Sequence, residues 1–278
     1  MIETPDPAAE DGGYPSLLHV LDLSADGPDT FLAPTPRGSV NRLFGGQVLA
    51  QALRAAALTV DPRLQPHSLH GYFLRLGRAD TPLHLEVQRL RDGRSFSSRS
   101  VLARQEGRVI FSLQSSFHEP DGELDWSVDG PSLPGPDEVK GGGWEMMSRT
   151  AAAFEARPAG PVDAAGRRPL HPVWLRLIDP LPDDPAIRAC ALAFMSDFGL
   201  ARAMALRLDH DAPPGRVASL EQSLWLHRPT RLEDWHLMSV EPVSFHGSRG
   251  LATGSLHTQT GVRIATFTQE ALLRPPSR

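Results

Sequence analysis

Cysteine and lysine are almost absent from this sequence of 278 residues. Cys190 is the single cysteine and Lys140 the single lysine. One cysteine cannot form an intrachain disulfide, and it excludes a zinc site built from several thiolates. The formal net charge is −5 at pH 7 and the pI is about 6.1. We therefore expect no nucleic-acid-binding surface, which would need a basic face.

Long apolar runs and a secretion signal are missing too. No apolar stretch reaches the roughly 20 residues that a transmembrane helix needs. The start of the chain, Met-Ile-Glu-Thr-Pro-Asp-Pro, lacks the basic and apolar regions of a signal peptide. These absences predict a soluble, cytoplasmic protein with no membrane partner.

Several familiar catalytic motifs are not present. The sequence has no G-x-S-x-G motif, which argues against the serine site of an α/β-hydrolase. It has no Walker loop, and no G-x-G-x-x-G motif follows a strand. His67 and His70 lie three positions apart on an expected strand, so they should point to opposite faces and are not expected to share a metal.

The composition is that of a globular protein, and the length allows two units. Hydrophobic residues make up 40% and charged residues 22% of the chain, which is enough to bury a core. A length above the usual range of roughly 100–200 residues is compatible with two units or one large one. Residues 1–15 are acidic and rich in proline and glycine, so we expect a flexible arm.

Residues 16–118 are expected to form a first unit. A short amphipathic helix is predicted around Leu17–Leu23, and Val48, Leu49, Ala52 and Ala56 repeat at helical spacing. Asp61-Pro62 should end that second helix. Strand-like segments with turn residues between them follow. They are Ser68–Leu76, Leu83–Arg91, Ser95–Arg104 and Val109–Phe117.

Residues 119–170 are rich in proline and glycine and are expected to form a linker, with a possible helix near Trp144–Phe154. The pattern then returns in residues 171–278, the second unit. A helical stretch over Ile187–Leu208 is interrupted around Ser196–Gly199. The strands predicted around it are Pro172–Leu177, Ala218–Leu226, Trp235–Pro242, Gly250–Thr258 and Arg263–Leu273.

The shared order of helix and four strands indicates a duplication. Ser68-Leu69 matches Ser219-Leu220 at a spacing of about 151, and Gly107 matches Gly261 at about 154. Each helix can be buried if its antiparallel sheet wraps around it. The two sheets can then join edge to edge, which protects both edges. The expected fold class is therefore α+β, with two tandem units.

Three polar residues are candidates for chemistry. Asp197 is a carboxylate within the apolar run Ala193–Leu200, although a helix cap would place an aspartate there as well. Ser219 and Gln269 lie on expected strands, where such residues commonly make ordinary hydrogen bonds. Spacing alone therefore does not separate a catalytic from a structural role.

Several stretches of the chain resemble signature segments of the acyl-CoA thioesterase II family, the TesB-like proteins. The resemblance runs in one consistent order from about Ser16 to Arg274, and the segments are specific only when taken together. They are Arg42-Leu43-Phe44-Gly45-Gly46-Gln47-Val48, His67–Arg75, Arg91-Asp92-Gly93-Arg94-Ser95-Phe96-Ser97, Ala218–Leu220 with Ser223–Pro229, Ser248-Arg249-Gly250 and Thr268-Gln269-Glu270.

This resemblance implies a double hot-dog fold, in which each long helix is wrapped by an antiparallel sheet. It also implies a catalytic set of Asp197, Ser219 and Gln269. Two local differences from the family pattern are Glu221-Gln222, where Asp-His is common, and Ala271, where glycine is usual.

The chemistry implied is hydrolysis of fatty acyl-CoA to a free fatty acid and CoA. Asp197 would act as general base on a water held by Ser219 and Gln269, or as a nucleophile, and backbone N–H groups at a helix start would polarise the carbonyl. This scheme needs no metal or organic cofactor. Its partner is the acyl-CoA substrate, and a homodimer is expected. The alternatives are a noncatalytic acyl-CoA-binding protein and a hot-dog enoyl-CoA hydratase or dehydratase.

Overall fold

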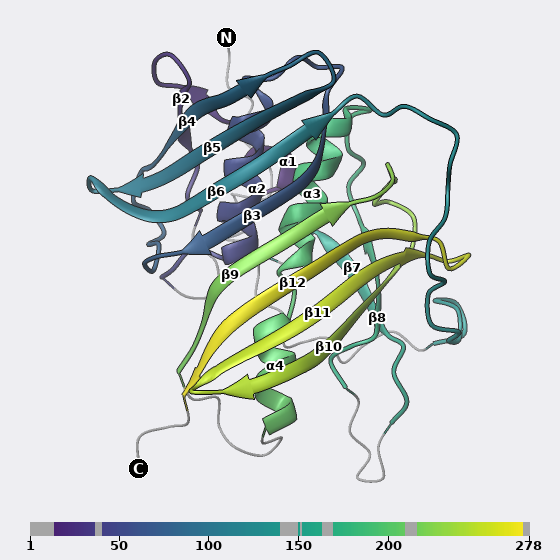
Figure 1. The fold of residues 1–278 in the computed structure, drawn as a ribbon. Coiled ribbons are helices and arrows are strands. Elements are labelled where there is room, and N and C mark those ends of the chain that lie inside the picture. Colours follow the sequence, from purple (N-terminus) through teal and green to yellow (C-terminus); the bar gives the residue numbers. More distant parts are fainter. Residues whose placement is uncertain are drawn as a thin grey trace.

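The computed structural model describes residues 14–36, 41–139, 150, 152–162, 169–208 and 216–274. Within them the strands form one 12-stranded sheet, and helices lie along its inner face (Figure 1). Every strand pairing is antiparallel. The sheet divides into two halves of the same strand order, which is the arrangement expected of a double hot-dog.

The first half of the sheet has the order β1-β2-β4-β5-β6-β3. Its strands are β1 (Ser24–Ala25), β2 (Thr30–Ala33), β3 (Gln65–Phe73), β4 (Leu83–Asp92), β5 (Phe96–Gln105) and β6 (Arg108–His118). The second half has the order β9-β12-β11-β10-β8-β7. Its strands are β7 (Phe154–Pro158), β8 (Val173–Leu177), β9 (Arg216–Leu226), β10 (His236–His246), β11 (Arg249–Thr258) and β12 (Arg263–Arg274).

The nine long predicted strands are all present, with ends shifted by a few residues. Strand β7 lies inside the segment predicted to be a linker, and it extends the second sheet to its edge. β1 and β2 have no counterpart in the prediction, since two to four residues are too few to show a period. Residues 1–13 of the predicted arm, and residues 144–149 and 151 of the possible helix near Trp144–Phe154, lie outside the described residues.

Four helices are described: α1 (Leu17–Val20), α2 (Gly45–Ala57), α3 (Pro185–Ser196) and α4 (Leu200–Leu208). The first sheet wraps α2, and α3 packs against α2 and the junction of the two sheets. The second sheet covers α4 (Figure 1). The predicted interruption near Asp197 therefore separates two helices with different neighbours.

The span Pro185–Leu208, 24 residues that cover α3 and α4, is the one described helical stretch that is long and apolar enough to cross a membrane. Much of it is buried: Cys190, Ala191, Ala193, Phe194 and Met195 are each at most 1% exposed. Packing against α2 and the sheet explains its apolar character, as in the core helix of a globular protein.

The two halves meet where β3 pairs with β9, from Ser68 opposite Trp225 to Tyr72 opposite Glu221. His70 and Ser223 are partners in this ladder, and they also hydrogen-bond through His70 Nδ1 and Ser223 Oγ at 2.7 Å. They are 153 residues apart. A pseudo-twofold axis passes between them if they are equivalent positions of the two units.

A shared bulge supports that equivalence. The register of β3 against β6 skips His67, and the register of β9 against β12 skips Leu220. The two skipped residues are also 153 apart, so the predicted match of Ser68 with Ser219 was wrong by two positions. The predicted match of Gly107 with Gly261 agrees with the structure, because both glycines turn with a positive φ, 73° and 86°.

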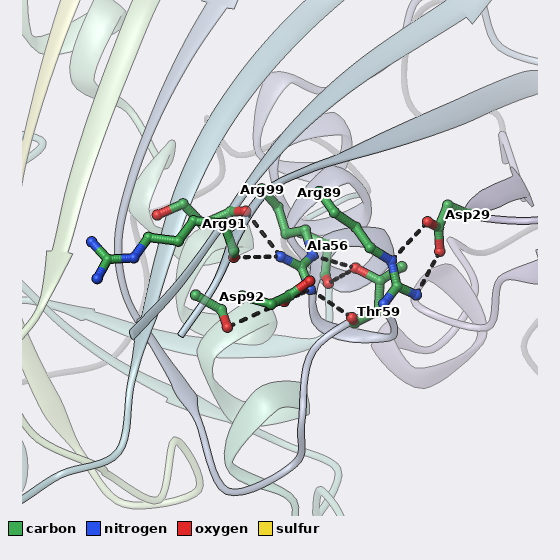
Figure 2. Close-up of polar contacts among 9 residues, drawn as sticks. Asp29, Ala56, Thr59, Arg89, Arg91, Asp92 and Arg99 are labelled. Atoms are coloured by element: carbon green, nitrogen blue, oxygen red, sulfur yellow. Dashed lines mark hydrogen bonds and ion pairs between the residues drawn. The ribbon is translucent and has the colours of Figure 1, made fainter. Parts of the chain in front are cut away.

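A fully buried arginine holds the end of α2 in place. Arg99, on β5, is 0% exposed. Its Nε donates to Thr59 Oγ1 at 2.8 Å, its Nη2 donates to Thr59 O at 2.8 Å and to Asp92 Oδ1 at 2.5 Å, and its Nη1 donates to Arg91 O at 3.0 Å (Figure 2). Thr59 Oγ1 in turn donates to Ala56 O at 2.8 Å. The guanidinium thus joins Thr59, two residues after the end of α2, to Arg91 and Asp92 at the end of β4.

Candidate active site

Asp197 lies at the break between α3 and α4. It is the C-cap residue of α3, with φ −89° and ψ 3°, and its own N–H donates to Met195 O. Gly199, with φ +79°, then reverses the chain into α4. This turn directs the Asp197 side chain away from its own unit and toward the start of α2 in the other unit.

Two donors hold the Asp197 carboxylate. Gly46 N–H donates to Oδ2 at 2.8 Å, and Gln269 Nε2 donates to Oδ1 at 2.5 Å. Gly46 is in the first turn of α2, where N–H groups have no helical partner and favour a negative charge. Asp197 therefore joins the two units at a helix N-terminus.

Apolar surroundings dominate the electrostatics of Asp197. Phe44, Phe194 and Phe198 form a cluster of rings with centroids 5.1 to 5.8 Å apart. The residue keeps partial solvent exposure, but its carboxyl group is enclosed by protein atoms. Burial raises the pKa of Asp197 from 3.8 to about 6, and the hydrogen bonds from Gln269 and Gly46 oppose that rise. The carboxyl group therefore titrates close to neutral pH.

The close approach of α2 to Asp197 requires both glycines of the Phe44-Gly45-Gly46 motif. A Cβ at Gly45 would lie 2.7 Å from Asp197 Oδ2. A Cβ at Gly46 would lie 2.3 Å from the carbonyl oxygen of Phe194. Contacts this short do not occur for real Cβ atoms, so only glycine lets the helix start reach the carboxylate.

A chain of side-chain amides continues from Asp197 into the core. Gln269 Nε2 also donates to Gln222 Oε1 at 3.0 Å, and Gln222 Nε2 donates to Ser196 Oγ at 2.8 Å. Gln269 and Gln222 are both 0% exposed. The Oε1 atom of Gln269 is buried and has no hydrogen-bond partner among the described residues. It is therefore an acceptor that is available to a bound molecule.

Ser219 reaches the same face of the sheet because of the bulge at Leu220. It lies opposite Ala271 in the ladder, while Gln222 lies opposite Gln269. Residues three apart on a regular strand face opposite sides, but one extra residue at a bulge restores the same side. Among the described residues, Asp197 and Ser219 share no hydrogen bond, so the structure joins Asp197 to Gln269 directly and places Ser219 beside them.

Sequence reasoning missed Gln222 and Ser196 as members of this network. Gln222 was noted only as a difference from the family pattern. Its burial on a strand next to Leu224 would have indicated an inward side chain, but only once the bulge was known. Gly46 belongs to a motif that the sequence singled out, although its contact with Asp197 depends on packing between the units.

The pseudo-equivalent position in the other half carries different groups. The N-cap of α3 is Asp184, whose own carboxylate accepts from Ala186 N–H at 2.8 Å and Ile187 N–H at 3.2 Å. The N-cap of α2 is Phe44, which makes no side-chain cap. Ser115 occupies the place of Gln269, because it pairs with Leu69 as Gln269 pairs with Gln222. The start of α3 thus has its own cap, while the start of α2 receives Asp197.

A cavity of about 670 Å³ lies at this second position and not at Asp197. It is lined by the start of α3 and by the segments after β6 and β9, including Pro185, Arg188, Asp121 and Arg228. Among the described residues that line this cavity, no carboxylate is enclosed and hydrogen-bonded in the way that Asp197 is. The cavity's titratable side chains include His67, His118 and His227 and two exposed aspartates, Asp121 and Asp183.

His67 and His70 have other partners. His67 Nε2 lies 2.9 Å from Ser116 Oγ, and His70 binds Ser223. No group of three or more potential metal ligands occurs among the described residues.

The fold and the site define a double hot-dog protein with a buried, amide-held carboxylate between its units. Sequence profiles described as the acyl-CoA thioesterase N-terminal and C-terminal domains match residues 32–118 and 127–273. Acyl-CoA thioesterase 2 of Haemophilus influenzae is 31% identical over 283 residues, which cover 93% of this chain and 97% of that protein. Human acyl-coenzyme A thioesterase 8 is 32% identical over 279 residues, which cover 92% of this chain and 88% of that protein.

Solved structures agree with these relatives. Acyl-CoA thioesterase II TesB2 of Mycobacterium marinum has a TM-score of 0.81 at 36% identity, and the match covers 94% of this chain and 99% of that one. A hot-dog protein of unknown function from Alicyclobacillus acidocaldarius has a TM-score of 0.76 at 20% identity, covering 94% and 98%, which supports the fold alone. The chain belongs to the acyl-CoA thioesterase family, so the family resemblance and the double hot-dog expectation are confirmed.

Proposed function

We propose that this protein hydrolyses fatty acyl-CoA thioesters to a carboxylic acid and CoA, with Asp197 as the general base. The observation that carries the proposal is the Asp197 carboxyl group, which is held by Gly46 N–H and Gln269 and has a pKa of about 6. A base is most effective when its pKa is near the working pH, because it is then ionised and still able to accept a proton.

Gln269 and Ser219 supply the orientation of the attacking water. The Nε2 of Gln269 is used by Asp197, while its Oε1 is free to accept a water hydrogen. A water bound between Oε1 and the carboxylate would donate one hydrogen to each. Ser219 lies on the same face of the sheet and adds a hydroxyl beside them. Asp197 then removes the proton as the water oxygen bonds to the thioester carbon.

The start of α2 supports the negative charge that forms on the carbonyl oxygen. Gly46 N–H already serves Asp197, so the neighbouring N–H groups of the first turn are the donors available to the oxyanion. When the C–S bond breaks, the thiolate of CoA leaves with the electron pair. Protonated Asp197 returns its proton to that sulfur, and the carboxyl group is ready for the next cycle.

A dehydratase or hydratase of this fold would pair its carboxylate with a histidine. The described hydrogen-bond partners of Asp197 are a backbone N–H and a glutamine amide, which favours hydrolysis. A noncatalytic binding protein would have no need of an enclosed carboxyl group at a helix start.

The test is release of CoA from acyl-CoA substrates of increasing chain length, measured with a thiol reagent. Hydrolysis of any of them supports the proposal. Binding without CoA release would instead identify a noncatalytic protein. Single turnover in ¹⁸O-labelled water tests the role of Asp197. A general base puts the label in the fatty acid alone, whereas label in the protein identifies a nucleophilic Asp197 whose anhydride is opened by water at the aspartyl carbonyl carbon.

A further inference from the structure

Arg75 and Arg228 are equivalent residues just after β3 and β9. Arg75 N–H donates to Ile110 O at 3.1 Å and Arg228 N–H donates to Ile264 O at 3.4 Å. Their side chains are anchored alike: Arg75 Nη1 donates to Val109 O and Arg228 Nη1 donates to Arg263 O, both at 2.6 Å. Each half of the duplicated protein therefore has an arginine at this position with the same backbone hydrogen bonds.

The charges of these two arginines are balanced differently. Arg228 Nε donates to Asp125 Oδ1 at 3.0 Å, and its Nη2 contacts the same oxygen. Arg75 forms no ion pair with any described residue, and its side chain is exposed. Its anchor is a neutral carbonyl, so the guanidinium keeps its full charge and most of its donors.

The segment that carries Arg75 runs beside the candidate active site. A Cβ at Gly45 would lie 3.2 Å from the Phe73 ring, and Leu43 N–H donates to Gly77 O at 3.0 Å. Arg75 lies between Phe73 and Gly77 in the chain. It is thus a short distance outward from the start of α2, where Asp197 is held.

The surface around Arg75 combines charge with apolar area. Leu74 is 51% exposed and Leu76 is 63% exposed. Arg42, just before α2, is exposed and also forms no ion pair with a described residue, while Arg78 is paired with Glu106. A ligand with phosphate groups and an apolar or aromatic part fits such a surface.

At the second position, Arg228 and Arg188 lie against carboxylates. Asp125 binds Arg228, and Asp121 and Asp183 line or border the cavity there. Arg188, also at the cavity, lies 3.5 Å from Asp183. Arg231 also lines this cavity, is exposed and forms no ion pair with a described residue. The residue equivalent to Arg75 is nevertheless paired in this half, and a paired arginine attracts phosphate weakly.

We propose that Arg75 binds a phosphate group of CoA at the mouth of the Asp197 site, and that the loss of this free charge at Arg228 confines CoA binding to one half of the duplicated protein. This inference rests on the proposed function and names the part of the substrate that Arg75 recognises. CoA carries its phosphates at the far end of the pantetheine arm from the sulfur. A phosphate-binding residue should therefore lie outward from Asp197, as Arg75 does.

The test compares Arg75→Gln with Arg228→Gln, a matched control that loses the same backbone anchor in the other half. Each variant is assayed with octanoyl-CoA and with octanoyl-N-acetylcysteamine, a thioester that has no phosphate. Arg75→Gln should raise KM for octanoyl-CoA by about tenfold, as expected for one charged hydrogen-bonding contact. The kcat should change little, and the kinetics with the phosphate-free thioester should stay at the wild-type level.

Arg228→Gln should match the wild type with both thioesters, and Arg75→Lys should recover part of the lost affinity. The inference is overturned if Arg75→Gln matches the wild type with octanoyl-CoA, or if it weakens both thioesters equally. Binding of free CoA by calorimetry separates this inference from the proposed function. If the wild-type protein cleaves neither thioester, the proposed hydrolysis is refuted. If Arg75→Gln, but not Arg228→Gln, then binds free CoA about tenfold more weakly than the wild type, the phosphate contact is still supported.

Discussion

Replacing Asp197 by asparagine should abolish most activity while making the protein more stable at neutral pH. The substitution preserves the shape of the side chain and keeps one oxygen to accept from Gly46 N–H. It removes the basic oxygen, so the rate of thioester cleavage should fall by about 10²–10⁴-fold. The loss should appear in kcat, because in the proposed mechanism Asp197 acts on the reacting water and not on the CoA moiety.

The expected gain in stability follows from the pKa. A pKa of about 6 in place of 3.8 means that the fold disfavours the ionised form of Asp197, by about 3 kcal/mol at about 1.4 kcal/mol per tenfold change. Because the folded pKa is raised, the contribution is favourable below the unfolded pKa and is lost as the pH rises through about 6. Asparagine never ionises and so avoids this loss.

The assay is urea unfolding of the wild type and Asp197→Asn at pH 4.5 and pH 8. At pH 4.5 both side chains are mostly neutral in the fold, and the two proteins should differ little. At pH 8 the variant should be more stable, by up to about 3 kcal/mol. The reasoning is refuted if the folded variant keeps near wild-type activity, or if the stability difference does not grow with pH.

Three further changes test the site and its support. Gly46→Ala places a Cβ 2.3 Å from a carbonyl oxygen, so it should lower the free energy of unfolding in urea by about 1–3 kcal/mol and should also lower kcat. An unchanged kcat would contradict the contact between Gly46 and the Asp197 carboxylate. Gln269→Ala should slow turnover by about 10–100-fold, and Ser219→Ala should slow it by less. The double variant should lose less activity than the product of the two single effects, because in the proposed mechanism both residues orient one water. Independent effects of the two substitutions would argue against a shared water. Arg99→Met should lower the free energy of unfolding by about 2–4 kcal/mol, and the pH profile of the remaining activity should not change. A decrease below about 0.5 kcal/mol would show that other groups hold the end of α2 in place.

The long elements of the fold could be predicted because their periodicity is strong. The strands of both sheets alternate buried and exposed residues, as in Phe96–Gln105, and α2 carries its apolar residues at helical spacing. β1 and β2 are too short to show a period, and β7 lies in a segment rich in proline and glycine. All three are held by hydrogen bonds to neighbouring strands. Edge strands of this kind follow from the tertiary structure more than from their own residues.

The site was only partly predictable, for a related reason. Asp197 and Gln269 were expected to act together, and they are in direct contact. The inward position of Gln222 depends on a bulge at Leu220, which no composition or period indicates, and a bulge changes the facing of every residue beyond it. Both repeats carry the bulge at the same place. The error of two positions in matching Ser68 with Ser219 therefore comes from a match of residue types and not from the bulge.

The two units differ in how the starts of their helices α2 and α3 are capped. In α3 the cap is supplied locally by Asp184, which satisfies the first N–H groups. In α2 the cap residue is Phe44, and the partner of Gly46 N–H comes from the other unit. Local capping leaves the second position with a stable helix and no reactive carboxylate. At the first position the helix start instead binds the Asp197 carboxylate, which is the group that the proposed chemistry uses.

The pH dependence of acyl-CoA cleavage in single turnover tests the central claim most directly. With saturating enzyme and octanoyl-CoA, the rate should rise from pH 5 and level off above about pH 7, with an apparent pKa near 6 that belongs to Asp197. The residual rate of Asp197→Asn should lack this rise. A wild-type rate that is independent of pH across this range, or a variant that keeps the same rise, would contradict the assignment of Asp197 as the base.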